Sequence, residues 1–253
     1  MPHITIDGVS LEYLRYGAED RNRTSLVFLH HGLGSAGLWR DFPEALAART
    51  GLPAIAYSRR GYGGSDPGDG PRPIEYLENE ALDVLPKVLD GLAIDKAICV
   101  GHSEGGSIAL VFAAEHPSRV DALLLESAHV LVEQSNLASI ARTRKDYETG
   151  GLRERLKRHH GDNVDGAFYG WSGMWLQPGF DRWTIEGFAS RVKCPVLAIL
   201  GCRDEYVSEE HFERLVGLLG GPVEAVKMAC GHAPHEECRD AVLDRMVRFV
   251  DAL

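Results

Sequence analysis

The chain has 253 residues, of which 44% are hydrophobic and 25% charged, a composition typical of globular proteins rather than disordered or fibrous ones. Its length suits one α/β domain or one domain that carries an insertion. The net charge of −10 argues against nucleic acid as a partner, because nucleic-acid binding depends on clustered Lys and Arg.

Two further classes are excluded by local composition. No apolar run approaches the roughly 18 residues needed to cross a bilayer, so we expect no membrane partner. The start, MPHITIDGVS, lacks the basic and apolar regions of a signal peptide, which favours a cytoplasmic protein. The five cysteines include no CxxC pair, so we expect reduced thiols and no metal site.

The first predicted element is an antiparallel hairpin. The segment HITIDGVSLEYLRYG alternates apolar and polar residues on both sides of the turn signal Asp7-Gly8. After it come short, continuous apolar runs that suit strands buried on both faces of a parallel sheet. These predicted strands are Ser25–His31, Pro53–Ser58, Lys96–Gly101, Val120–Glu126, Pro195–Gly201 and Pro222–Met228.

Helix-period segments alternate with these runs, which predicts an α/β fold with helices on both sides of the sheet. The predicted helices are Trp39–Ala48, Ile74–Leu92, Gly105–Glu115, Glu209–Leu219 and Glu236–Val250. In such sheets ligands bind at the carboxyl ends of the strands, so the residues that follow each strand are the candidates for function.

One region breaks the alternation. Residues 131–190 contain no convincing strand, only the helical stretches Leu137–Thr149 and Leu152–His159 and an aromatic patch from Phe168 to Trp183. We therefore expect a core formed by residues 1–130 and 191–253, with residues 131–190 as a helical cap inserted over the sheet.

The segment Gly101-His102-Ser103-Glu104-Gly105 directly follows one predicted strand and precedes a predicted helix. This G-x-S-x-G pattern is typical of a nucleophile elbow, in which a sharp strand-to-helix turn exposes the serine above the sheet. The helix N-terminus would then direct free N–H groups at a developing oxyanion. Ser103 is the predicted nucleophile.

A serine nucleophile needs a base and an acid that orients the base. In this arrangement the chain order is serine, acid, histidine. Asp204 follows the strand Pro195–Gly201 and His232 follows the last strand, so both lie where the order requires them. The alternatives are Glu205 or Glu126 as the acid and His235 as the base.

The oxyanion needs two N–H donors. The first predicted donor is the backbone of Glu104, which follows the nucleophile, and the second is the backbone of Leu33 in the glycine-containing loop His31–Ser35. The segment Arg59–Pro67, RRGYGGSDP, lacks the Gly-Lys-Ser/Thr of a phosphate-binding loop and is interpreted as a structural loop.

With HGLGS, RRGYGGSDP, GHSEGG, GCRDE and CGHAPHE in this order, the chain resembles the α/β-hydrolase family. The cap and the acidic residue after the serine are similar to the valacyclovir hydrolase (biphenyl hydrolase-like) group of serine esterases. The resemblance implies an eight-stranded, mostly parallel sheet, a helical cap, no cofactor, and hydrolysis of a small-molecule ester, thioester or amide. Carbon–carbon bond hydrolysis, aminopeptidase action and perhydrolysis use the same triad, and a hydrolase-fold ligand receptor is the alternative of another class.

The resemblance also suggests pocket residues. In the resembled group the acidic side chain after the nucleophile binds the α-amino group of amino-acid esters, which suggests this role for Glu104; the alternative is that its side chain joins a polar network. Trp171, Trp175 and Tyr206 are candidates for an apolar pocket, or for packing of the cap. His30 is a further pocket candidate, because the pair His30-His31 doubles the family's usual single histidine.

Overall fold

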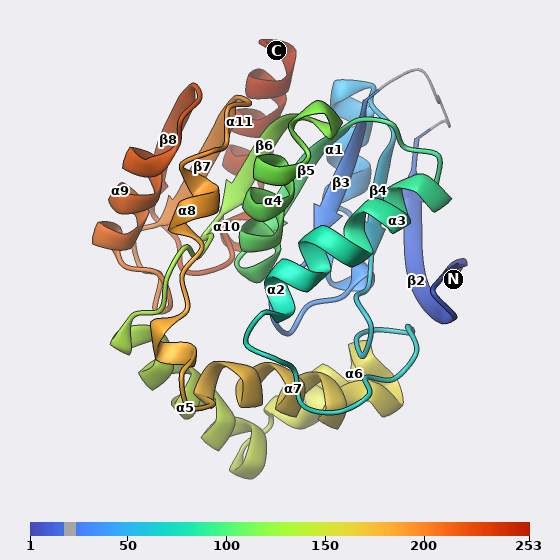
Figure 1. Cartoon of the computed structure of the whole chain (residues 1–253), viewed down its shortest axis with the longest axis vertical. Coiled ribbons are helices and arrows are strands. Elements are labelled where there is room, and N and C mark those ends of the chain that lie inside the picture. Colours follow the sequence, from blue (N-terminus) through green and yellow to red (C-terminus); the bar gives the residue numbers. More distant parts are fainter. Residues whose placement is uncertain (18–23) are drawn as a thin grey trace.

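The computed structural model describes residues 1–17 and 24–253. It contains an eight-stranded sheet in the order β1-β2-β4-β3-β5-β6-β7-β8, in which the β1-β2 and β2-β4 pairs are antiparallel and the rest parallel. The predicted fold class, α/β with a mostly parallel sheet of eight strands between helices, is confirmed (Figure 1). The strands are β1 (His3–Ile6), β2 (Val9–Tyr16), β3 (Ser25–Leu29), β4 (Ala54–Tyr57), β5 (Ala97–His102), β6 (Val120–Glu126), β7 (Val196–Gly201) and β8 (Val223–Met228).

The predicted hairpin is present. Ile6 pairs with Val9 across a two-residue turn, and both turn residues have positive φ, 50° at Asp7 and 81° at Gly8. Positive φ at both central positions fits a turn whose twist matches that of the flanking strands.

The prediction that every later strand is buried on both faces is wrong for β8. Strands β3 to β7 are almost entirely buried, whereas β8 alternates between partly buried and exposed positions. The reason is its place at the edge of the sheet, where it pairs only with β7.

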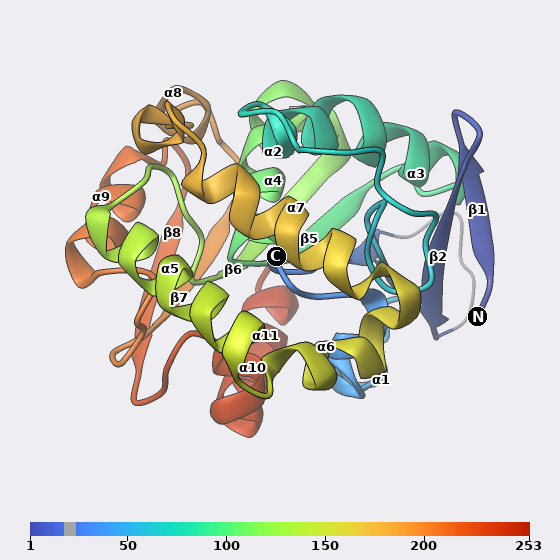
Figure 2. The same ribbon diagram turned by 90° about the horizontal axis from the view of Figure 1, so that it is seen from below.

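Helices cover both faces of the sheet, as Figure 2 shows from below. On one face lie α1 (Phe42–Thr50) and α11 (Arg239–Asp251), and on the other α2 (Tyr76–Asn79), α3 (Leu85–Gly91), α4 (Glu104–Glu115) and α9 (Glu209–Leu218). The predicted helix Ile74–Leu92 is divided by a π-helical turn, Glu80–Val84. Pro86 lies just after this turn and has no N–H to donate to the preceding turn, which explains the interruption.

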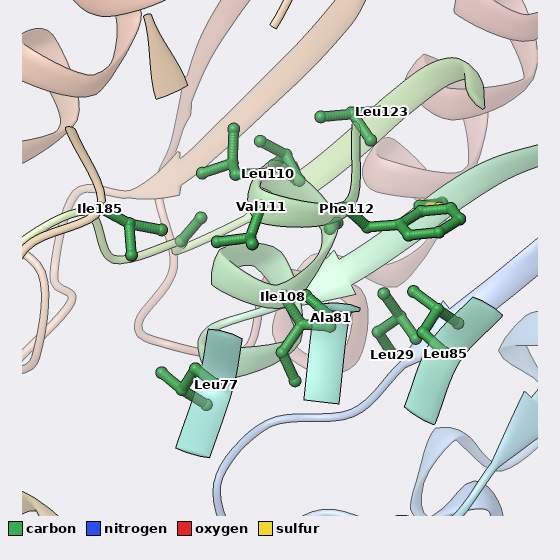
Figure 3. Packing of buried hydrophobic residues seen from close by; sticks show 14 of the residues in the cluster. Leu29, Leu77, Ala81, Leu85, Ile108, Leu110, Val111, Phe112, Leu123 and Ile185 are labelled. Carbon is green, nitrogen blue, oxygen red and sulfur yellow. The ribbon is translucent and has the colours of Figure 1, made fainter. Parts of the chain in front are cut away.

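Helix α4 is the central helix of the larger core. Ten of its twelve residues are buried, because it packs between the sheet on one side and α2 and the π-helical turn on the other. Figure 3 shows Ile108, Val111 and Phe112 of this helix among side chains of its neighbours. Since Ser103 directly precedes α4, this packing fixes the position of the candidate nucleophile.

The segment between β6 and β7 forms α5 (Gln134–Thr149), α6 (Leu152–His160), α7 (Val164–Leu176) and α8 (Glu186–Ala189). Figure 1 shows α5, α6 and α7 gathered beyond one end of the sheet. The aromatic patch expected here belongs mainly to α7, which was not predicted as a helix. Helix α8 falls within the expected cap range of 131–190 but packs against α4 and α9. Among the described residues, no helix has the length and apolar character required to span a bilayer.

Candidate active site

Ser103 occupies a strained turn between β5 and α4. Its φ of 55° and ψ of −118° lie in a backbone region that residues other than glycine rarely adopt, as expected for a nucleophile elbow. The turn also requires close approach of two backbones, because a Cβ on Gly105 would lie 1.8 Å from the carbonyl oxygen of Leu29. Only glycine fits there, so the close approach of β3 to the start of α4 depends on the glycine of the motif.

Asp204 and His232 form a close carboxylate–imidazole pair at the carboxyl ends of β7 and β8. Nδ1 of His232 lies 2.9 Å from each carboxylate oxygen of Asp204. The backbone N–H groups of Tyr206 and Val207 donate to the same carboxylate. Burial raises the pKa of Asp204, but the hydrogen bonds, above all that from His232, outweigh burial and lower this pKa to about 2.

A second histidine lies beside the candidate nucleophile. Oγ of Ser103 is 3.2 Å from Nε2 of His129, which follows β6 and is buried. Burial, followed by the nearby His211 and His232, lowers the pKa of His129 well below its ordinary value, so its ring is neutral. The hydroxyl of Ser103 thus rests against His129, while His232 is paired with Asp204.

A cavity of about 140 Å³ opens above Ser103 and brings core and α5–α7 residues together. None of its described lining residues is Asp, Glu, Lys or Arg. Its walls are mainly aromatic rings, imidazoles and aliphatic side chains, with one amide and the hydroxyl of the serine. The lining residues are His31, Gly32, Leu33, Ser103, His129, Asn136, Ile140, Trp171, Trp175, Tyr206 and His232.

The candidate oxyanion donors lie on two segments. Glu104 is the first residue of α4, so its backbone N–H is one of those without a partner inside the helix. The N–H of Leu33 donates to Nδ1 of His31 over a long distance of 3.3 Å. Leu33 is held from the other side as well, because its carbonyl accepts a hydrogen bond from Nε2 of His160 in α6.

The side chain of Glu104 is directed away from the cavity above Ser103 into a buried network. Its Oε2 accepts a hydrogen bond of 3.0 Å from Arg59, and its Oε1 accepts one of 2.7 Å from the indole of Trp175. Glu104 is only 1% exposed. A substrate amine would have to displace Arg59 from this carboxylate, so the geometry favours the polar network over amine binding.

The remaining pocket candidates differ in position. Trp171, Trp175 and Tyr206 line the cavity above Ser103, and Trp175 also packs against His129 and Phe180. His30 lies outside this cavity, and its two ring nitrogens bond to the backbone of His31 and Arg59.

Glu126 and His235, which the sequence offered as an alternative acid and base, are hydrogen-bonded to each other. The backbone N–H and Nδ1 of His235 lie 2.9 and 2.8 Å from Oε2 of Glu126. His235 lines a second cavity, of about 260 Å³, whose described lining does not include Ser103. The two cavities share His31, Leu33 and His232. Of the pairs Asp204–His232 and Glu126–His235, only the first therefore reaches the cavity that contains the serine.

Sequence reasoning did not identify Arg59, His129 or His160. His129 had a usable signal, because it closely follows a predicted strand at the carboxyl edge. Arg59 and His160 had none, since their roles depend on contacts with segments distant in sequence. Across residues 1–17 and 24–253, no group of three or more His, Cys, Asp and Glu side chains is arranged to hold a metal ion.

The elbow, the sheet order and the residues at the strand ends define an α/β-hydrolase. A family model described as "alpha/beta hydrolase fold" matches residues 24–188, and the chain belongs to this family. The structure of the meta-cleavage product hydrolase CumD from Pseudomonas fluorescens IP01 is similar, with a TM-score of 0.81 and 22% sequence identity, and the match covers 100% of this chain and 98% of that one.

Two curated relatives are similar in sequence. The human serine hydrolase BPHL is 25% identical over 82% of this chain and 72% of its own length, which confirms the expected resemblance as a distant one. The putative carbamate hydrolase RutD of Caulobacter segnis is 34% identical over 48% of this chain and 43% of its own length. The chain spans only about two fifths of the length of the curated relatives with which it shares its strongest local matches.

Proposed function

We propose that the protein is a serine hydrolase that cleaves a carboxylic ester of a small molecule through an acyl-enzyme. The observation that carries this proposal is that Ser103, in its strained elbow, and His232 line the same cavity. His232 is in turn paired with Asp204, whose side chain is buried. A nucleophile, a base and an orienting acid on this fold support acyl transfer.

The first half of the reaction forms the acyl-enzyme. Rotation about the Cα–Cβ bond of Ser103 moves its hydroxyl from His129 to His232, which accepts the proton as Oγ attacks the carbonyl carbon. The backbone N–H groups of Leu33 and Glu104 stabilise the oxyanion, and Leu33 gives up its long bond to His31 to do so. Asp204 stabilises the imidazolium of His232, which then protonates the leaving alcohol.

The second half releases the acid. His232 takes a proton from a water molecule, the resulting hydroxide attacks the acyl carbonyl, and the proton returns to Oγ of Ser103 as the ester bond to the enzyme breaks. The same two N–H groups stabilise the second tetrahedral intermediate.

The two cavities support separate binding places for the acyl group and the leaving group of the substrate. The acyl group must lie against Ser103, and the cavity there is small, aromatic and free of charged lining residues, which favours a short, uncharged acyl chain. The leaving group must lie against His232, its proton donor. The second cavity, which shares His232 and carries Arg40 and Glu236 in its lining, provides room for a more polar group.

Hydrolysis of p-nitrophenyl acetate and butyrate at neutral pH tests the proposal. We expect turnover by the wild type, its loss in Ser103→Ala, and its retention in Ser172→Ala. Ser172 is a matched control, because it is also a buried serine but lies on α7 outside the lining of the cavity. Turnover that survives in Ser103→Ala would contradict the proposal.

A further inference from the structure

The two candidate oxyanion donors come from different segments of the chain, and something must hold them at a fixed separation. Leu33 lies in the loop after β3, whereas Glu104 begins the helix after β5. An oxyanion hole is effective only when its donors are already in place, because reorganisation during the reaction forfeits their advantage.

One buried guanidinium bonds to both segments. Nη1 of Arg59 donates to the carbonyl of His30 at 2.6 Å, and Nη2 donates to the carbonyl of His31 at 3.1 Å, just before Leu33. Nη2 also donates to the carboxylate of Glu104 at 3.0 Å. Arg59 and Glu104 are each only 1% exposed.

We infer that Arg59 and the side chain of Glu104 are positioning residues that set the spacing of the oxyanion donors and connect them to helix α7 through Trp175. This inference rests on the proposed function. We call the Arg59–Glu104–Trp175 group the oxyanion brace.

The topology explains why an arginine is needed. Arg59 follows β4, which neighbours β3 but is separated by β3 from β5 and the helix after it. The side chain must therefore extend beyond the end of β3 to reach Glu104. The planar guanidinium can bond two carbonyls and one carboxylate in a fixed geometry, whereas the ammonium of a lysine lacks this fork.

The loop His31–Ser35 carries the candidate donor Leu33, and we call it the oxyanion loop. It packs directly against the brace. A Cβ on Gly32 would lie 3.1 Å from Oε1 of Glu104 and 2.2 Å from Nε1 of Trp171. Gly32, which directly precedes the donor Leu33, therefore leaves no room for a side chain between itself and these two groups. A shift of either one would displace the donor.

The connection to α7 is specific as well. Oε1 of Glu104 accepts the indole N–H of Trp175, and the ring of Trp175 packs edge-to-face against His129, with centroids 5.1 Å apart. The same carboxylate thus contacts the loop after β4, the nucleophile elbow and the helix that covers the cavity. Movement of α7 would be transmitted to the donors.

The first test replaces Arg59 and compares it with its neighbour. Arg60 is the matched control, because it is partly exposed and its hydrogen bonds within the described part of the chain go to the carbonyl of Pro67 and to Asp69. We expect Arg59→Met to lower kcat for p-nitrophenyl butyrate by about a hundredfold, in the range for a lost oxyanion donor, with KM within about threefold. Arg60→Met should retain wild-type values.

A double variant separates positioning from stability. Arg59→Met alone leaves the Glu104 carboxylate buried without its cation, so its thermal midpoint should fall. Adding Glu104→Gln removes that charge and should restore part of the midpoint, yet kcat should stay low because the carbonyls of His30 and His31 still lack their hydrogen bonds from the guanidinium. Recovery of kcat together with the midpoint would overturn the inference, and so would a folded Arg59→Met variant with wild-type kcat.

A second readout does not depend on matching the substrate. The rate at which a fluorophosphonate labels Ser103 also depends on the oxyanion hole, and Arg59→Met should slow it about as much as it lowers kcat. Trp175→Phe, which removes the indole N–H together with one ring of the indole, should slow labelling by about tenfold. A wild type with neither turnover nor labelling would refute the proposed function itself, whereas equal labelling of wild type and Arg59→Met would refute only the brace.

Discussion

Two carboxylate–histidine pairs of the described chain, Asp204–His232 and Glu126–His235, lie at the carboxyl ends of strands β6 to β8, and they differ in what surrounds them. Asp204 and His232 follow β7 and β8, and His232 lines the cavity of Ser103. Glu126 and His235 are equally close, but both are buried and His235 does not line that cavity. Pairing of an acid with a histidine therefore does not distinguish these two pairs, whereas access to the proposed nucleophile, Ser103, does.

Replacing each histidine in turn tests most strongly whether the two pairs differ in function. His232→Gln removes the base and should lower kcat by about 10⁴-fold or more, as when a triad member is lost. His235→Gln should stay within about tenfold of the wild type, because its ring has no access to Ser103. Ester hydrolysis with both variants checks this, and a larger loss in His235→Gln would reverse the assignment.

The two acids extend the test. Asp204→Asn keeps the size of the side chain but favours the wrong tautomer of His232, and we expect kcat to fall by up to about 10⁴-fold. Glu126→Gln should instead lower the free energy of unfolding by about 1–3 kcal/mol, because buried hydrogen bonds to a charged group are weakened. Kinetics and urea unfolding of both variants separate the outcomes. Similar kinetic losses in both would contradict the distinction.

His129 refines the comparison, because it contacts Ser103 directly but bonds to no carboxylate among the described residues. An unpaired neutral imidazole has no acid to stabilise it as a base. We therefore expect His129→Leu to change kcat by no more than about tenfold. Steady-state kinetics checks this, and a thousandfold loss would make His129 a member of the catalytic machinery.

The smallest predicted effect concerns His160, which connects α6 to the oxyanion loop. Its Nδ1 accepts the N–H of Gly63 while its Nε2 donates to the carbonyl of Leu33, so only the neutral ring satisfies both bonds. Burial lowers the pKa of His160 to about 4. Because the unfolded chain binds this proton more readily, its contribution to stability is complete above about pH 6.5 and is lost as pH falls towards 4.

The corresponding experiment compares unfolding at two pH values. Between pH 7 and pH 5.5 protonation linked to His160 should lower the free energy of unfolding of the wild type by about 1 kcal/mol. His160→Gln should lack this part of the pH dependence, whereas His3→Gln, at an exposed position, should keep it. An unchanged pH dependence in His160→Gln would show that His160 does not contribute to the pH dependence of stability.

Much of the core could be predicted because it is encoded locally. The strands of the parallel sheet are continuous apolar runs, and the elbow at Ser103 requires Gly105 next to it. The edge position of β8 could not be predicted in this way, since it depends on which strands pair. Helix α7 was missed because Gly166, Gly170 and Gly173 lower its helix propensity, and packing of its aromatic face outweighs that loss.

The oxyanion brace was beyond sequence reasoning for a related reason. Arg59 lies in a glycine-rich loop and Glu104 in the elbow motif, and an arginine in such a loop is ordinarily exposed. Its burial follows from a partner 45 residues away, which only the fold brings into contact. The same contact favours the polar network over amine binding as the role of the Glu104 side chain.

Labelling with a fluorophosphonate followed by peptide mapping tests the central claim most directly, because it reports the nucleophile and its base without a chosen substrate. We predict one adduct on Ser103 in the wild type, at least a hundredfold slower labelling in His232→Gln, and near wild-type labelling in His235→Gln. An adduct on another residue, or equal labelling of Ser103 in His232→Gln and the wild type, would contradict the proposed catalytic triad.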